Sequence, residues 1–299
     1  MWFIFSLITI FFWGGSDLFS KKGTDPKDKY SHWRLVIMVG AAMGLHAFCY
    51  IAITGVAYSP FSIIRYFPVA FLYILAMVLG YAGLRYIELS VSSPICNSSG
   101  AVAALLCFFV LGQRISGAQF AAVSLICGGI LLLSYLQKRQ ERILRAEQGI
   151  EEPRKYMVGL IAILFPILYC FIDGLGSFMD AYYLENLMDE AEANLSFEFT
   201  FLLIALIGFI YLKRVRKQKF PQKSEKTFTL AALCETAGQF TYVYALADNA
   251  IVAAPMISSY CIFSVLLSRI FLKEKLSRRQ YAAILMVMIG IAILGAMND

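Results

Sequence analysis

The chain has 299 residues, of which 60% are hydrophobic and only 15% are charged, and its mean hydropathy is +0.69. Soluble domains carry about 25% charged residues, so this composition excludes an ordinary soluble protein. The formal net charge of +6 comes from bases in loops beside apolar segments, with no aromatic residues between them. That placement excludes nucleic acid as a partner and favours anionic membrane lipid.

Apolar segments follow one another along the whole chain. Each is close to the about 20 residues that cross about 30 Å of hydrocarbon. None alternates with a period of two, which predicts helices rather than barrel strands. The predicted fold class is therefore an all-α integral membrane protein with ten transmembrane helices, at residues 2–20, 33–54, 63–86, 91–111, 117–136, 156–183, 197–212, 227–247, 251–271 and 279–296. The first segment has neither a preceding basic region nor a small-residue cleavage site, so we expect no cleaved signal peptide.

The sequence repeats itself when it is shifted by 161 residues. The stretch "SGAQFAAVSLICGGILLL" from Ser116 then lies over "SRRQYAAILMVMIGIAIL" from Ser277, and Pro94 lies over Pro255. Five spans per half is an odd number, so the second half must enter the membrane from the opposite side. We therefore predict two inverted-topology repeats, residues 1–136 and 156–299, joined by a basic cytoplasmic linker at 137–155.

Aspartates occur at matching places in the two halves. With a shift of 156, Trp13 and Asp17 face Tyr169 and Asp173. A carboxylate inside a span costs about 2.5–3.5 kcal/mol on insertion scales, so it faces a wet cavity or a partner. Asp17 also has a simpler interpretation, because it stands four residues before Lys21 and would pair with it near the interface.

A third acid lies deep in an apolar segment, "FTLAALCETAGQFTYVYALA", where Glu235 shares a helix face with Gln239 and Tyr242. It would serve either as an ion- or proton-coupling group or as a structural hydrogen-bonding partner. The three acids Asp17, Asp173 and Glu235 are the predicted coupling residues.

Polar residues early in two matched spans, and the aromatic partners of the acids, are candidates for contacting a substrate. Serine also commonly joins membrane helices to one another, which is the alternative for the serines. The predicted substrate-binding residues are Trp13, Tyr81, Asn97, Ser98, Tyr169, Gln239, Tyr242, Ser258 and Ser259.

Small residues predict close helix contacts. Gly40 and Gly44 form a GxxxG packing motif. Small residues in the fifth and tenth spans would suit either homodimer contacts or internal packing, and these are Ser124, Gly128, Gly290, Ala292 and Ala296.

Motifs of enzymes and pumps are absent from the sequence. The seven cysteines and two histidines show no CxxC or mixed metal-ligand spacing, and no GxSxG, HExxH or phosphate-binding glycine loop occurs. We therefore predict neither an enzyme, nor an ATP-driven pump, nor a metal or other cofactor.

The two halves resemble the ten-helix EamA-type members of the drug/metabolite transporter superfamily. Trp13, Gly14 and Lys21 match the family's Trp-Gly and later Lys in a first helix, and Glu274 in "LKEKLS" matches its glutamate after a fourth helix. The first half departs from this pattern, because Gln113 stands in that place. The family's general pattern also does not include Asp17, Asp173 and Glu235.

The resemblance implies a secondary transporter, with the first four helices of each half around a central cavity and the fifth and tenth at the periphery. Together with the acids, it predicts an alternating-access carrier for a small polar metabolite, with a cationic one preferred and with proton coupling. An uncoupled uniporter or exchanger and a non-transporting sensor remain the alternatives. The short tails and basic loops predict a multi-pass protein of a bacterial inner or plasma membrane.

The distribution of bases predicts that both termini are extracytoplasmic, whereas members of the resembled family usually keep them in the cytoplasm. On ten spans, only Arg65 and Arg114 lie on the side of the termini, and short cytoplasmic loops retain positive charge. A reporter fused at the C-terminus should read out as extracytoplasmic, and one fused in the 137–155 linker as cytoplasmic. The reverse pattern would overturn the orientation.

Overall fold

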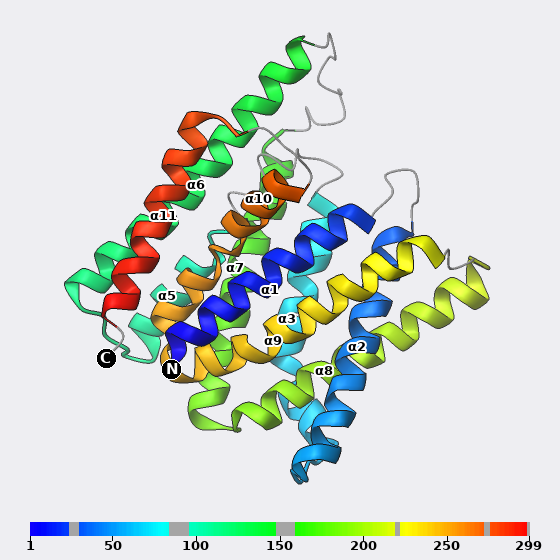
Figure 1. The fold of residues 1–299 in the computed structure, drawn as a ribbon. Helices are drawn as coiled ribbons and strands as arrows, with labels where there is room; N and C mark the ends of the chain where they lie inside the picture. Colours follow the sequence, from blue (N-terminus) through cyan, green and yellow to red (C-terminus); the bar gives the residue numbers. More distant parts are fainter. Residues whose placement is uncertain (24–29, 84–95, 148–158, 219–221, 272–275, 298–299) are drawn as a thin grey trace.

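The computed structural model describes residues 1–23, 30–83, 96–147, 159–218, 222–271 and 276–297, and each regular element in these ranges is a helix (Figure 1). The all-α prediction is confirmed. A π-helical turn, η2 (Tyr211–Val215), follows α8. The α-helices are α1 (Trp2–Gly23), α2 (Ser31–Thr54), α3 (Phe61–Gly83), α5 (Ser99–Val110), α6 (Gly117–Glu147), α7 (Gly159–Asn186), α8 (Glu190–Ile210), α9 (Gln222–Ile257), α10 (Tyr260–Phe271) and α11 (Arg278–Ala296).

Six of the described helices are long and apolar enough to cross a membrane. Many large apolar side chains on the outside of the helices are exposed, among them Ile53 at 83%, Phe109 at 76% and Ile207 at 68%. A soluble monomer would not expose so many, whereas hydrocarbon solvates them. The chain is therefore a multi-pass integral membrane protein.

One pair of helices, α5 and α10, begins and ends at equivalent positions of the sequence repeat. Ser99 and Tyr260 begin α5 and α10, and Val110 and Phe271 end them, with 161 residues between the members of each pair. A two-residue turn precedes each helix, at 97–98 and at 258–259. The same local break therefore occurs at matching places in both halves.

The long helix α9 bends at Asn249, where the backbone is extended with φ −160° and ψ 79°. The bend lies between the predicted segments 227–247 and 251–271. The prediction that 251–271 is continuous needs correction, because the helix is interrupted at 258–259. Ser259 Oγ donates to the Met256 carbonyl at 2.6 Å and Ser258 Oγ to the Ala254 carbonyl at 3.0 Å. Such side-chain hydrogen bonds compete with the helical ones, and the preceding Pro255 provides no N–H.

The helices are arranged so that α1 lies along α9, and α6 and α11 lie side by side at one edge of the molecule (Figure 1). Thr9 and Thr241 join α1 to α9 through a 2.7 Å hydrogen bond between their hydroxyls. A Cβ atom at Gly290 would come within 2.7 Å of Ile126, and one at Gly128 within 3.0 Å of Met286. Two of the small residues considered for dimer contacts thus serve the internal packing of α6 against α11.

Gly40 lets α2 approach α8 closely. A Cβ atom there would lie 2.4 Å from the Phe201 carbonyl oxygen and 2.5 Å from the Ala205 Cβ. The packing predicted for the GxxxG motif is present at this contact.

Gly40→Ala should therefore destabilise the protein by about 1–3 kcal/mol, because the backbone carbonyl cannot move aside without separating the helices. A lower midpoint of thermal unfolding in detergent would show this. Gly117→Ala is the matched control, since a Cβ atom at Gly117 would meet nothing within 4 Å. Equal midpoints for the two variants would contradict the assigned contact.

Candidate functional site

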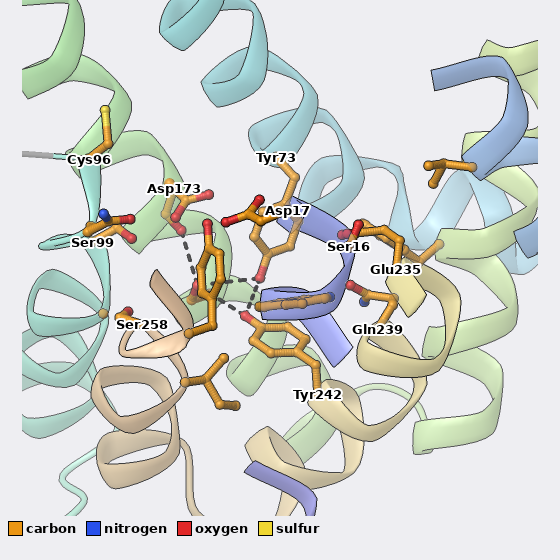
Figure 2. Close-up of a pocket in the computed structure, with 18 of the residues that line it drawn as sticks. Ser16, Asp17, Tyr73, Cys96, Ser99, Asp173, Glu235, Gln239, Tyr242 and Ser258 are labelled. Atoms are coloured by element: carbon orange, nitrogen blue, oxygen red, sulfur yellow. Dashed lines mark hydrogen bonds between the residues drawn. The ribbon is translucent and has the colours of Figure 1, made fainter. Parts of the chain in front are cut away.

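A cavity of about 380 Å³ lies among α1, α2, α7, α8 and α9, at the point where α5 and α10 begin. At one end its wall includes Ser20 and Leu35, near the end of α1 and the start of α2. At the other end it includes Ser177 and Tyr242, both buried. Figure 2 shows Ser16, Glu235 and Gln239 on one side of this space and Cys96, Ser99 and Asp173 on the other.

Most of the residues predicted from the sequence lie in this cavity wall. Ser98 and Ser259 do not line it, and Ser259 is fully buried with its hydroxyl on its own helix. The side chain of Tyr81, at the end of α3, and the whole of Glu274 lie outside the described part of the chain. The predicted residues that line the cavity are Trp13, Asp17, Asn97, Tyr169, Asp173, Glu235, Gln239, Tyr242 and Ser258.

Asp173 and Asp17 lie at the beginnings of the two equivalent helices. Asp173 is hydrogen-bonded to the side chain of Ser99, the first residue of α5. Asp17 interacts electrostatically with Tyr260 and Cys261, the first residues of α10. A helix N-terminus carries a partial positive charge, which stabilises a nearby carboxylate. The two aspartates thus occupy the same place in the two halves of the fold.

Asp17 is exposed to the open space of the cavity. The side chain of Lys21, its alternative partner, lies outside the described part. The position beside α10 nevertheless shows that Asp17 belongs to the cavity wall and not only to the membrane interface.

Glu235 lies on α9 across from α1. Its side chain is hydrogen-bonded with Ser16 and interacts electrostatically with Asp17. Tyr260, the first residue of α10, interacts electrostatically with both Asp17 and Glu235. The Glu235 carboxyl group therefore belongs to the same polar cluster as Asp17.

The cavity wall combines acids with aromatic rings. Among its described residues there is no lysine or arginine. The Trp13 ring lies 5.0 Å from that of Tyr242 and 5.7 Å from that of Tyr260, measured between ring centroids. Such rings and carboxylates together provide the environment that attracts an organic cation, by charge and by cation–π attraction of about 0.5–2 kcal/mol.

A network of hydroxyl groups lies at the end of the cavity near Tyr242 (Figure 2). The Tyr73 and Tyr242 hydroxyls are 2.6 Å apart, and Tyr242 donates to Ser177 Oγ at 3.1 Å. Ser177 in turn donates to the backbone carbonyl of Asp173 at 3.2 Å. The network joins α3, α7 and α9, and its three hydroxyl groups belong to residues of the cavity wall.

Asp180 lies beyond this network and is fully buried. It accepts a 2.6 Å hydrogen bond from Tyr66 and a 3.5 Å one from Tyr73. Sequence reasoning did not select Asp180 as a site residue, although it stands seven positions after Asp173 on the same helix face. Nothing in the sequence marked Tyr66 and Tyr73 as site residues, because they lie in an apolar segment with no acidic neighbour.

A second polar pair lies away from the cavity, between α2 and α8. His46 Nδ1 is 2.8 Å from Glu198 Oε1, and Glu198 is fully buried. Asn194 donates to the same oxygen at 3.0 Å. In the described residues, no group of three His, Cys, Asp or Glu side chains is placed to hold a metal ion.

Packed membrane helices around a polar cavity are the architecture expected of a membrane transporter. A protein-family model identifies the family. It matches residues 1–135 and again residues 159–296, and its description is "EamA-like transporter family". The chain therefore belongs to the EamA-like transporter family, in two repeats that cover nearly all of it.

Solved structures support the fold. One of them, described only as "Crystal structure of protein", aligns with a TM-score of 0.72 over 99% of this chain and 96% of its own. At 14% identity this likeness shows a shared fold and nothing about the substrate. The comparison with curated proteins gave no match.

Tyr66→Phe should lower the free energy of unfolding by about 1–3 kcal/mol, because it removes the donor to a fully buried carboxyl group. Thermal unfolding in detergent measures the effect. Tyr182→Phe is the control, since Tyr182 is on the neighbouring helix α7 but is 39% exposed. If the two variants unfold at the same temperature, the Tyr66–Asp180 hydrogen bond does not stabilise the closed end.

Proposed function

We propose that the protein is a secondary active transporter that moves a small, polar, cationic metabolite by alternating access, with proton coupling. The observation that carries this proposal is a cavity wall with Asp17, Asp173 and Glu235 and no lysine or arginine among its described residues. Acids held inside a membrane protein must be balanced by protons or by a bound cation. A site that exchanges one for the other couples their movements without ATP.

Glu235 is the group best suited to that exchange. Asp173 is compensated by its hydrogen bond to Ser99 at the N-terminus of α5. Glu235 has Ser16 as its hydrogen-bonding partner and a neighbouring negative charge at Asp17. A cation or a proton at Glu235 relieves that repulsion, and the two compete for the same carboxyl group.

Alternating access requires that each end of the cavity can close. We propose that the Tyr73–Tyr242–Ser177 network is the closed gate of the state described here, and that separating the two tyrosine hydroxyls opens it. The opposite end lies near Ser20 and Leu35, on the side of the loop between α1 and α2. That loop belongs to the basic side of the molecule, so under the proposed orientation this state is open to the cytoplasm.

Ten spans in two inverted halves give the symmetry that such a cycle needs. Three features support this arrangement: the equal 161-residue offset of α5 and α10, the matched turns that precede them, and the bend at Asn249 that divides α9. In the opposite state, the equivalent positions of the two halves would exchange roles and form a second gate at the other end of the cavity. Residence in a plasma membrane, with extracytoplasmic termini, completes the proposal.

The test uses purified protein in liposomes that contain a pH-sensitive dye. The external compounds are polyamines, choline-like amines, amino acids and nucleosides, and Glu235→Gln is compared with the wild type. We expect cationic compounds to trigger proton flux in the wild type, and the flux to fall at least tenfold in the variant, because the amide neither binds a proton nor attracts a cation.

Glu185→Gln is the matched control, since Glu185 is an exposed acid at the end of α7, outside the cavity. Radiolabelled amine that still crosses without any proton flux would identify an uncoupled uniporter or exchanger. Flux with nucleosides or acidic amino acids alone would overturn the cationic substrate.

A further inference from the structure

Two nitrogen donors in the cavity wall have no hydrogen-bonding partner. They are Nε2 of Gln239 and Nε1 of Trp13, and both atoms are buried. The Gln239 side chain is only 4% exposed, and Figure 2 shows it one helical turn from Glu235 beside the cavity. Buried donors without acceptors are costly, and native proteins contain few of them. Two such donors in one wall leave hydrogen-bonding capacity that the described residues do not use.

The packing holds the indole in position. Gly238 makes room for it, since a Cβ atom at Gly238 would come within 2.4 Å of Trp13 Cδ1 and 2.7 Å of Nε1. The rings of Tyr242 and Tyr260 contact the indole from two other directions. The N–H therefore cannot turn toward a partner within the protein without repacking three aromatic side chains.

The neighbouring charges restrict which acceptor can bind. Glu235 is four positions before Gln239 on α9, which places the two side chains about 5–6 Å apart at their Cβ atoms. Asp17 adds a second negative charge close to Glu235. A carboxylate or phosphate at Gln239 would be repelled by both, whereas the oxygen of an amide, ester or ketone accepts two N–H groups without a net charge.

We infer that the substrate carries a neutral carbonyl-type acceptor, held by Gln239 and Trp13, about one helical turn from the cationic group that the acids hold. The inference rests on the proposed function and restricts it to amines with a neutral acceptor near their far end. Simple alkyl amines leave both donors unpaired. Sites that hydrogen-bond a polar group in this way discriminate against ligands that lack it.

The probes are two amines of the same size. 4-Aminobutanamide carries a carbonyl group at a suitable distance from its ammonium group, and 4-methylpentylamine replaces the amide with a branched alkyl end. Their dissociation constants are measured calorimetrically with detergent-purified wild type, Gln239→Met and Trp13→Phe. Gln119→Met, a glutamine of α6 that does not line the cavity, is the control.

We expect Gln239→Met to raise the dissociation constant of 4-aminobutanamide at least tenfold more than that of 4-methylpentylamine, because methionine keeps the volume of the side chain and removes its donor. Trp13→Phe should show the same selective loss, and Gln119→Met none. Thermal unfolding confirms that each variant is folded. If Gln239→Met does not fold, the comparison of the two amines in Trp13→Phe tests the inference.

The two hypotheses fail in different ways. If both amines bind to the wild type, lose affinity together in Glu235→Gln, and are affected equally by Gln239→Met and Trp13→Phe, then water occupies the donors and the inference is wrong while the cationic transporter stands. If neither amine binds to the wild type, or if Glu235→Gln binds both as well as the wild type does, the cationic function itself fails and the inference falls with it.

Discussion

Hydrocarbon offers no hydrogen-bonding partner, so every polar side chain inside the bilayer must be matched within the protein or by what it binds. The polar interior of this chain follows from that constraint. Asp173 is matched by Ser99 at the start of α5, and Asp180 by Tyr66. The donors of Gln239 and Trp13 are left without a partner. Both of these donors belong to residues of the cavity wall.

The two repeats share a framework but not a chemistry. Asp17 and Asp173 are equivalent in the sequence repeat. Asp173 lies beside the start of α5 and Asp17 beside the start of α10, and each of these helices follows a two-residue turn. The 161-residue shift pairs Glu235 and Gln239 with Ile74 and Val78, which are apolar. The symmetric part of the molecule thus provides the paired aspartates and the matched helix breaks. The asymmetric part, on α9, provides the groups that we assign to coupling and recognition.

Tyr242 connects the contents of the cavity to its closed end. Its ring contacts that of Trp13 in the cavity wall, and its hydroxyl contacts Tyr73 and Ser177 in the hydroxyl network. In the proposed cycle, a ligand that moves the indole therefore also moves a hydroxyl group of the gate. Tight packing makes such a coupling discrete, because a displaced ring must find another complete set of contacts.

The sequence by itself determined the membrane setting, the helical class, the 161-residue register and the close approach at Gly40, because each depends on local composition or spacing. It also indicated Asp17, Asp173 and Glu235, since an acid in an apolar segment is visible without a structure. Only the tertiary structure decided that Tyr66 reaches Asp180, that Tyr73 meets Tyr242, and that the segment 251–271 breaks at 258–259. Tyr66 and Asp180 are 114 residues apart in the chain, and Tyr73 and Tyr242 are 169 apart. Helical periodicity shows which face of its own helix a residue occupies. Which other helix that face contacts depends on how all the helices pack, and that is a property of the whole fold.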